Sequence, residues 1–158
     1  FWYKTNVAGM FFSHSQAGCG NAYIEADVHT NGRPRLKGYN AGGGMAYTVY
    51  STTSTFDGEW HHYGGTQRAA TTTVSTWLDG VVASSTGIAP TNIGCQGPFF
   101  GVDERGGATS QYVGDLAEIM MWRQELTAAQ FISLYNTGMW YSEMLAGTSP
   151  ILYYTFDE

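Results

Sequence analysis

The sequence has few charged residues, and this scarcity excludes several classes of protein. Only 13% of its 158 residues are charged, against about 25% in a typical globular chain, so a coiled coil and a charge-rich disordered tail are both disfavoured. The 7 Lys and Arg residues form no run and are outnumbered by 13 Asp and Glu residues. We therefore expect no nucleic-acid partner, because nucleic-acid phosphates require a concentrated basic surface.

Long apolar segments are missing as well. No stretch approaches the roughly 18 consecutive apolar residues of a membrane-spanning helix. The segment Phe1–Thr5 is aromatic, whereas a secretion signal is basic and then apolar. We expect no membrane insertion, and if the protein is exported, its signal has been removed or lies outside this sequence.

The common catalytic motifs are also missing. The sequence has no serine in a nucleophile elbow and no pair of histidines with the spacing of a zinc-binding helix. Gly42, Gly43 and Gly44 lack the lysine and the following helix of a phosphate-binding loop, so they predict a flexible surface loop.

Aromatic residues and glycine are abundant, and they indicate an all-β chain. Aromatic residues make up 15% of the sequence, and 21 residues are glycine. Short β-forming runs alternate with Gly, Asn and Asp turns about every ten residues, as in an antiparallel sandwich of single-domain size. The predicted strands lie near residues 1–5, 10–15, 22–30, 35–39, 46–53, 60–66, 73–78, 81–85, 99–103, 112–122 and 151–156.

Two hairpin turns can be predicted in detail. Asp79-Gly80 suits a two-residue turn with positive φ, which sets Leu78 opposite Val81. At the other turn, a three-residue loop from Asn31 to Arg33 separates an apolar face from a polar face. That loop sets Val28 opposite Leu36, Asp27 opposite Lys37, His29 opposite Arg35 and Glu25 opposite Tyr39.

One helix is predicted near the C-terminus. Thr127 and Gln130 have the spacing of a capping box, and Phe131 and Leu134 fall on one helix face. Gly138 is placed to end the helix. We expect a linker over residues 139–150 and a further strand after it.

Several motifs occur in a fixed order between Asp57 and Gly138. They are Asp57-Gly58-Glu59-Trp60-His61-His62, Trp77-Leu78-Asp79-Gly80-Val81-Val82, Gly114-Asp115-Leu116-Ala117-Glu118-Ile119-Met120-Met121-Trp122, Leu126-Thr127-Ala128-Ala129-Gln130 and Leu134-Tyr135-Asn136-Thr137-Gly138. This order resembles the laminin-G-like and pentraxin-like domains of the concanavalin-A-like lectin/glucanase superfamily. The resemblance implies a jelly-roll sandwich of two antiparallel sheets over residues 1–138. It does not decide the function, because this superfamily includes lectins, adhesion modules, glycanases and packing modules.

Glu25 and Asp27 are the candidate catalytic carboxylates of a glycanase. A retaining glycanase needs two carboxylates on one face, about 5 Å apart. The third position of the usual glycanase pattern falls on Thr30, and Lys37 is a plausible ion-pair partner for Asp27. A solvated, ion-paired sheet face is the favoured interpretation, so we predict no enzyme and no catalytic residue.

Metal binding is considered at two places. His61 and His62 occupy adjacent strand positions and point to opposite faces, which is a poor arrangement for one metal ion. Asp103 and Glu104 stand where pentraxin-like proteins place acidic calcium ligands, so calcium is the candidate cofactor. Arg105 stands where that pattern has another acidic residue, and an ion pair with Arg105 is the competing interpretation.

The two cysteines, Cys19 and Cys95, have no metal-binding spacing. In a reducing compartment they would be ordinary small residues, and in an exported sandwich they would close one disulfide. The low charge, the Thr and Gly content and the resemblance all favour export, so we expect the disulfide.

A candidate ligand-binding face lies on the hairpin around Asn31-Gly32. Its polar side carries aromatic rings beside hydrogen-bonding groups, which is the chemistry that a glycan requires. The same pattern also describes an ordinary solvated sheet, and both interpretations stay open. The residues are Tyr23, Glu25, His29, Arg35 and Tyr39.

We expect an extracellular, non-enzymatic module, on a cell or virion surface or in the extracellular space. One interpretation is a structural or adhesive unit of a tandem array or filament, whose partners are other copies or adjacent repeats. The alternative is a glycan-binding, lectin-like domain, with or without calcium.

The last segment is the candidate assembly strand. It consists of Ile151, Leu152, Tyr153, Tyr154, Thr155 and Phe156. In laminin-G-like domains such a strand usually opens the domain, before the strand that Phe1–Thr5 resembles. In this sequence the similar segment, residues 151–158, follows the predicted helix and the linker. An unfilled sheet edge exposes unpaired backbone, so we expect residues 151–158 to complete this sandwich, a neighbouring copy or the next repeat. We favour the last two because of the length of the linker and because no other segment is a candidate for the gap.

Overall fold

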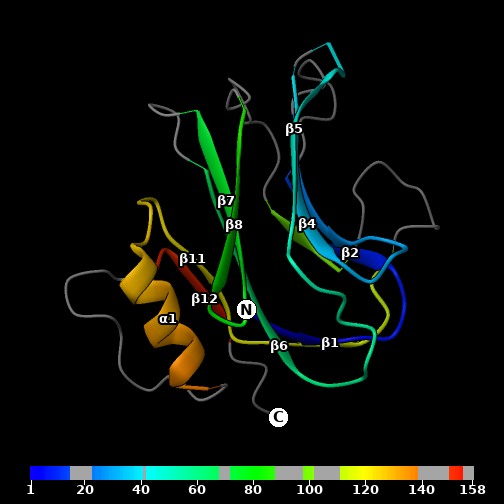
Figure 1. The fold of residues 1–158 in the computed structure, drawn as a ribbon, viewed down its shortest axis with the longest axis vertical. Helices are drawn as coiled ribbons and strands as arrows, with labels where there is room; N and C mark the ends of the chain where they lie inside the picture. Colours follow the sequence, from blue (N-terminus) through cyan, green and yellow to red (C-terminus); the bar gives the residue numbers. More distant parts are fainter. Residues whose placement is uncertain are drawn as a thin grey trace.

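The described part of the protein is a sandwich of two antiparallel β-sheets with one helix, as a computed structural model shows (Figure 1). The structure describes residues 1–14, 23–40, 42–67, 72–87, 98–101, 111–138 and 150–154. The predicted jelly-roll sandwich is confirmed.

Within the described ranges, each main sheet has five strands. The first sheet has the order β10 (Asp115–Ala117), β1 (Trp2–Lys4), β6 (His61–Gln67), β7 (Thr73–Leu78) and β8 (Val81–Thr86). The second sheet has the order β5 (Met45–Tyr50), β4 (Pro34–Tyr39), β3 (Tyr23–Val28), β2 (Gly9–His14) and β9 (Phe99–Phe100). A separate pair consists of β11 (Ile119–Met121) and β12 (Leu152–Tyr154).

The main core lies between the two sheets and is rich in aromatic rings. Tyr3 and Tyr63 of the first sheet pack with Phe11 of the second, and all three side chains are at most 1% exposed. The rings of Tyr3 and Phe11 lie 4.5 Å apart in a tilted arrangement. Such ring pairs add stability beyond the apolar area that they bury.

The turn between β7 and β8 confirms the first hairpin prediction. Asp79 and Gly80 have φ values of 49° and 79°, and Leu78 pairs with Val81. Asp and Gly adopt this left-handed conformation more readily than other residues, which is why the turn can be predicted from the sequence.

The predicted loop between β3 and β4 has the correct length, but its position is wrong by one residue. It spans Thr30–Gly32, and His29 N–H donates to Arg33 O at 3.1 Å across its base. Gly32 has a φ of 78°, so the glycine takes the left-handed last position of a three-residue loop. The predicted cross-strand partners are therefore wrong by two residues, although the division into faces holds. The observed pairs are Val28 with Pro34, Asp27 with Arg35, Ala26 with Leu36 and Glu25 with Lys37.

Helix α1 (Ala128–Asn136) confirms the predicted capping box. Gln130 N–H donates to Thr127 Oγ1, and Thr127 N–H donates to Gln130 Oε1 at 2.8 Å. Figure 1 shows α1 beside the first sheet, on the side away from the second sheet. The ring of Phe131 stacks on Trp77 with the ring centroids 4.9 Å apart.

Two consecutive glycines in β6 allow close packing on both faces of the first sheet. A Cβ atom added to Gly64 would lie 2.3 Å from the Phe131 ring. A Cβ atom added to Gly65 would lie 3.1 Å from Leu36 of the second sheet. Because side chains alternate along a strand, one glycine makes room for the helix and the other for the opposite sheet.

The strand predicted over residues 112–122 is interrupted at Glu118. This residue has a φ of 52°, which is unusual for a residue other than glycine. The interruption separates β10, which pairs with β1, from β11, which pairs with β12.

No helix in the described ranges is both long and apolar enough to cross a membrane.

Candidate functional site

The polar face of β3 and β4 carries a buried network of charges. Lys37 Nζ lies 2.7 Å from Glu25 Oε2 and 3.0 Å from Asp27 Oδ2. Arg35 donates to both oxygens of Asp27, at 2.6 Å and 2.9 Å. The expectation of a solvated face is wrong, because Glu25 is 1% exposed and Asp27 and Lys37 are each 7% exposed. Alternation along a strand shows which side chains share a face, but it does not show how deeply that face is buried.

Burial and charge act against each other in this network. Burial lowers the pKa of Lys37, but the charges and hydrogen bonds of Asp27 and Glu25 outweigh burial and raise it. Burial likewise lowers the pKa of Arg35, and its hydrogen bonds and its proximity to Asp27 raise it overall. Both cations are therefore fixed in the charged form, and both carboxylates have a cationic partner.

Aromatic rings lie beside this network. Tyr23 and Tyr39 stack with the ring centroids 4.1 Å apart. Tyr50 lies beneath two guanidinium groups, with Arg33 at 5.4 Å and Arg35 at 5.5 Å from its ring centroid. We call Tyr23, Tyr39, Tyr50, Arg33 and Arg35 the aromatic–cationic face.

The structure divides the five predicted ligand-binding residues into groups. Tyr23 and Tyr39 form the stacked pair, while Arg35 donates to Tyr50 Oη at 3.0 Å. His29 approaches Tyr50 edge to face at 5.6 Å. Glu25 is buried in the ion network, so it does not share the surface position of the others.

Sequence reasoning missed Tyr50 and Arg33. Tyr50 is the cross-strand partner of Arg35, which only the pairing of β4 with β5 reveals. Arg33 is held in place because its Nε donates to Ser51 O at 2.7 Å. The alternation of β5 is the one signal in the sequence that could have placed Tyr50 on this face.

The two adjacent histidines lie on opposite faces, as predicted, and they have different environments. His61 bridges two carboxylates, with Nδ1 2.7 Å from Asp79 Oδ2 and Nε2 3.0 Å from Asp57 Oδ1. The hydrogen bond to Asp79 raises the pKa of His61; burial opposes this effect, and Asp57 adds to it. Burial lowers the pKa of His62, whose ring centroid lies 5.2 Å from that of Trp2 and 6.2 Å from that of Tyr135.

The calcium and disulfide predictions lie outside the described residues. Asp103, Glu104, Cys19 and Cys95 all belong to ranges that the structure does not describe. Within the described ranges, no group of three or more His, Cys, Asp and Glu side chains could hold a metal ion.

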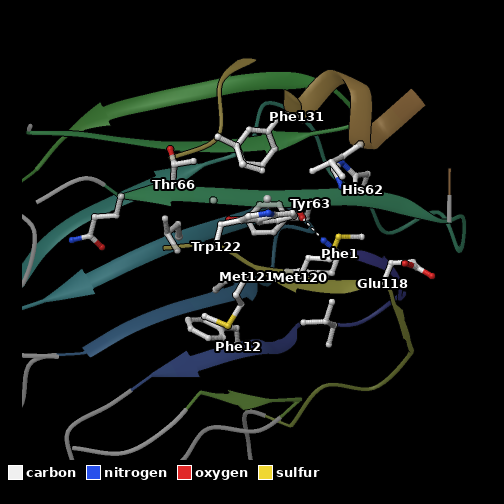
Figure 2. A pocket seen from close by; sticks show the side chains of 18 of the residues that line it. Phe1, Phe12, His62, Tyr63, Thr66, Glu118, Met120, Met121, Trp122 and Phe131 are labelled. Atoms are coloured by element: carbon white, nitrogen blue, oxygen red, sulfur yellow. Dashed lines mark hydrogen bonds between the residues drawn. The ribbon is translucent and has the colours of Figure 1, made fainter. Parts of the chain in front are cut away.

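A cavity of about 320 Å³ opens beside β6 (Figure 2). In Figure 2, Phe131 lies at one end and Phe12 at the other, with Trp122 between them. β11 supplies Met120 and Met121 to its wall. β6 contributes its residues from His62 to Gln67.

β12 pairs with β11, which lines this cavity. Its described residues are Leu152–Tyr154, and Ile151 N–H donates to Met121 O at 2.8 Å just before them. Tyr153 Oη donates to Glu118 Oε2, and Glu118 is 3% exposed. Ile151, Tyr153 and Tyr154 are 57%, 40% and 51% exposed.

Comparison with known proteins supports the fold. A laminin G family model, described as Concanavalin A-like lectin/glucanases superfamily, matches residues 1–131. A heptameric SAP-like pentraxin from Limulus polyphemus is similar in structure, with a TM-score of 0.64 and 16% identity over 85% of this chain and 66% of the pentraxin chain.

An S-layer domain-containing protein from Clostridium thermocellum gives a TM-score of 0.45 and 17% identity, over 83% of this chain and 64% of that one. The present chain thus spans just under two thirds of both proteins. A search of curated protein sequences finds no significant match.

Proposed function

Because the chain belongs to the Concanavalin A-like lectin/glucanases superfamily, we propose that it is an extracellular, non-enzymatic structural module that assembles with further copies by exchanging residues 151–158. The observation that carries this proposal is the position of β12 in a two-stranded pair, outside both main sheets. In the described part of the chain, β12 pairs with β11 alone. An isolated pair of strands is only marginally stable, so docking of β12 in its own chain contributes little stability.

Exchange of such a strand produces an open series of subunits. When one copy donates its strand to the next, the contact joins two different surfaces and need not close into a ring. The exposed side chains of Ile151, Tyr153 and Tyr154 would then have a second copy to pack against. The similar pentraxin is heptameric, so self-association is compatible with this fold.

The ion network supports a non-enzymatic role. A glycanase needs one carboxyl group that can donate a proton and a second that can attack or activate water. Here Lys37 contacts both Glu25 and Asp27, and Arg35 holds both oxygens of Asp27. Neither carboxylate is free for those tasks.

Deletion of residues 151–158 tests the proposal. We expect the intact chain to form concentration-dependent oligomers in sedimentation velocity experiments, and the deletion variant to remain monomeric and to melt at a lower temperature. A synthetic peptide of residues 150–158 should restore the lost stability. Ile132→Ser is the matched control, because Ile132 is an exposed apolar residue of α1 and does not belong to the exchanged segment.

Two results would contradict strand exchange. One is an intact chain that stays monomeric at all concentrations. The other is a deletion variant that assembles as the intact chain does.

The aromatic–cationic face supports a second candidate function, glycan binding. Stacked tyrosines and fixed guanidinium groups match the apolar patches and the hydroxyl groups of sugars. On a glycan array, Tyr39→Ser should lose any binding that the intact chain shows, while Tyr154→Ser should keep it. Equal binding by both variants would exclude this face.

A further inference from the structure

The aromatic–cationic face contains a cation that has no counter-charge. Arg33 forms no ion pair within the described ranges, and there its guanidinium group donates to a backbone carbonyl alone, Ser51 O. The neighbouring cations, Arg35 and Lys37, are balanced by the two carboxylates of the buried network. Three cations thus lie near two carboxylates, and the positive charge of Arg33 is uncompensated.

Basic residues are scarce in this chain and are concentrated at this place. The chain has 7 Lys and Arg residues and a formal net charge of −6. Positions 33, 35 and 37 hold three of these seven basic residues. The net charge of the chain disfavours the approach of anions, so the uncompensated charge of Arg33 is a local exception that favours an anionic ligand.

The side chains around the Tyr50 ring have hydrogen-bond donors left over. Tyr50 Oη accepts from Arg35 Nη1 at 3.0 Å and donates to no described residue, so its O–H group is available to a ligand. A guanidinium group has five N–H donors and no acceptor. Arg33 uses its Nε and Nη2 groups on Ser51 O, and its Nη1 group makes no hydrogen bond in the described ranges.

An oxyanion matches this set of donors. A sulfate or a carboxylate accepts several hydrogen bonds and donates none, and its charge strengthens the bonds that it accepts from a guanidinium group. A neutral sugar hydroxyl both donates and accepts. The nearest carboxylate, that of Asp27, already accepts from Arg35 with both oxygens. The available groups therefore favour an anionic group over a neutral hydroxyl group.

The stacked tyrosines on the same face favour a sugar as the carrier of the anionic group. Tyr23 and Tyr39 are half-buried, and aromatic rings of this kind suit the apolar patches of a sugar. Arg35 and Tyr39 lie four residues apart on β4, about 13 Å along the strand, and alternation places them on one face. An oligosaccharide can reach both ends of this face, whereas a free inorganic anion occupies one end only.

We propose that Arg33, Arg35 and Tyr50 form a site for the anionic group of an acidic glycan, either a sulfate or a carboxylate. The inference rests on the glycan binding proposed above and names the class of glycan that this face takes. It does not depend on strand exchange, because β4 and β5 belong to the second sheet and pair with neither β11 nor β12.

An array of carboxylated, sulfated and neutral oligosaccharides tests the site with the full chain. We expect acidic oligosaccharides to bind at least about tenfold more tightly than neutral ones with the same backbone. Raising sodium chloride from about 0.1 M to about 1 M shortens the Debye length from about 10 Å to about 3 Å, so it should weaken the binding of acidic oligosaccharides. Equal binding of acidic and neutral oligosaccharides would overturn the proposal.

Variants identify the residues that bind the anionic group. Arg33→Gln removes the uncompensated charge, and Arg123→Gln is its control, because Arg123 is an exposed arginine outside this face. We expect Arg33→Gln to weaken the affinity for acidic oligosaccharides at least about tenfold and Arg123→Gln to leave it unchanged. Tyr50→Phe keeps the ring and removes the O–H donor, so it should weaken the same binding. If Arg33→Gln and Tyr50→Phe both fold, as circular dichroism reports, and bind as the intact chain does, the site is excluded.

These results separate the inference from glycan binding itself. If no oligosaccharide binds, glycan binding fails and the inference fails with it. If neutral oligosaccharides alone bind, and Tyr39→Ser abolishes that binding, glycan binding stands and the anionic site does not. Sodium sulfate is the last probe. If it binds to the intact chain and no acidic oligosaccharide does, the site takes a free anion and the assignment to a glycan is wrong.

Discussion

Replacing Lys37 with methionine tests the buried ion network directly. The substitution keeps the length of the side chain but leaves Glu25, which is 1% exposed, without the ammonium group 2.7 Å from its Oε2. Removing one partner of a buried ion pair costs about 3–5 kcal/mol, because the remaining charge is desolvated and uncompensated. For a chain of this size each kcal/mol lowers the melting temperature by about 2–4 °C, so we expect a loss of roughly 6–20 °C.

The double variant Glu25→Gln/Lys37→Met isolates the interaction. It removes both charges together, and Asp27 keeps its two hydrogen bonds from Arg35. A buried pair replaced by neutral groups of similar volume is often as stable as the original. We therefore expect the double variant to be more stable than Lys37→Met, with a coupling energy of at least about 1 kcal/mol in a double-mutant cycle.

Chemical denaturation of the four proteins measures this cycle, and Lys4→Met is the control. Lys4 is a half-buried lysine of β1, and its loss should change the free energy of unfolding by less than about 0.5 kcal/mol. The reasoning is refuted if Lys37→Met is as stable as Lys4→Met, or if the double variant loses the sum of the two single effects.

Two further predictions concern the first sheet. The pKa of His61 is raised in the folded state. Its ion pairs therefore contribute stability that is fully present below the unfolded pKa of about 6.5 and is lost as the pH rises through the folded pKa. Melting temperatures measured across this pH range should show that loss in the intact chain and not in His61→Gln. Gly64→Ala should cost about 1–3 kcal/mol, because the new Cβ would lie 2.3 Å from the Phe131 ring. Gly42→Ala is the control for that variant, since nothing lies within 4 Å of its added Cβ, and equal melting temperatures for the two variants would contradict the packing argument.

The sequence predicts a structural feature correctly where that feature is set by interactions between residues that are close together in the chain. The turn at Asp79-Gly80 and the capping box at Thr127 are set by neighbouring residues, so the sequence alone predicts both. The predicted loop after β3 is wrong by one residue, because its position is set by Gly32, which takes the last loop position with a φ of 78°. A loop shifted by one residue along the chain keeps the same division into faces, so alternation alone does not fix its position.

The interruption at Glu118 could not be predicted, because no local preference favours a positive φ in a glutamate. Its side chain is buried and accepts a hydrogen bond from Tyr153, which is 35 residues further along the chain. The candidate site shows the same limit. Alternation correctly put Glu25, Asp27 and Lys37 on one face, but their burial depends on contacts between distant segments.

The two guanidinium groups over Tyr50 have a thermodynamic consequence. A free arginine side chain carries about 2 kcal/mol of rotamer entropy, which it loses when a ligand fixes it. Here folding has already fixed both groups, because Arg33 donates to Ser51 O and Arg35 donates to both oxygens of Asp27. A molecule that binds beside Tyr50 therefore meets arginines that are already ordered, and calorimetry of that binding should show only a small entropic penalty from the protein.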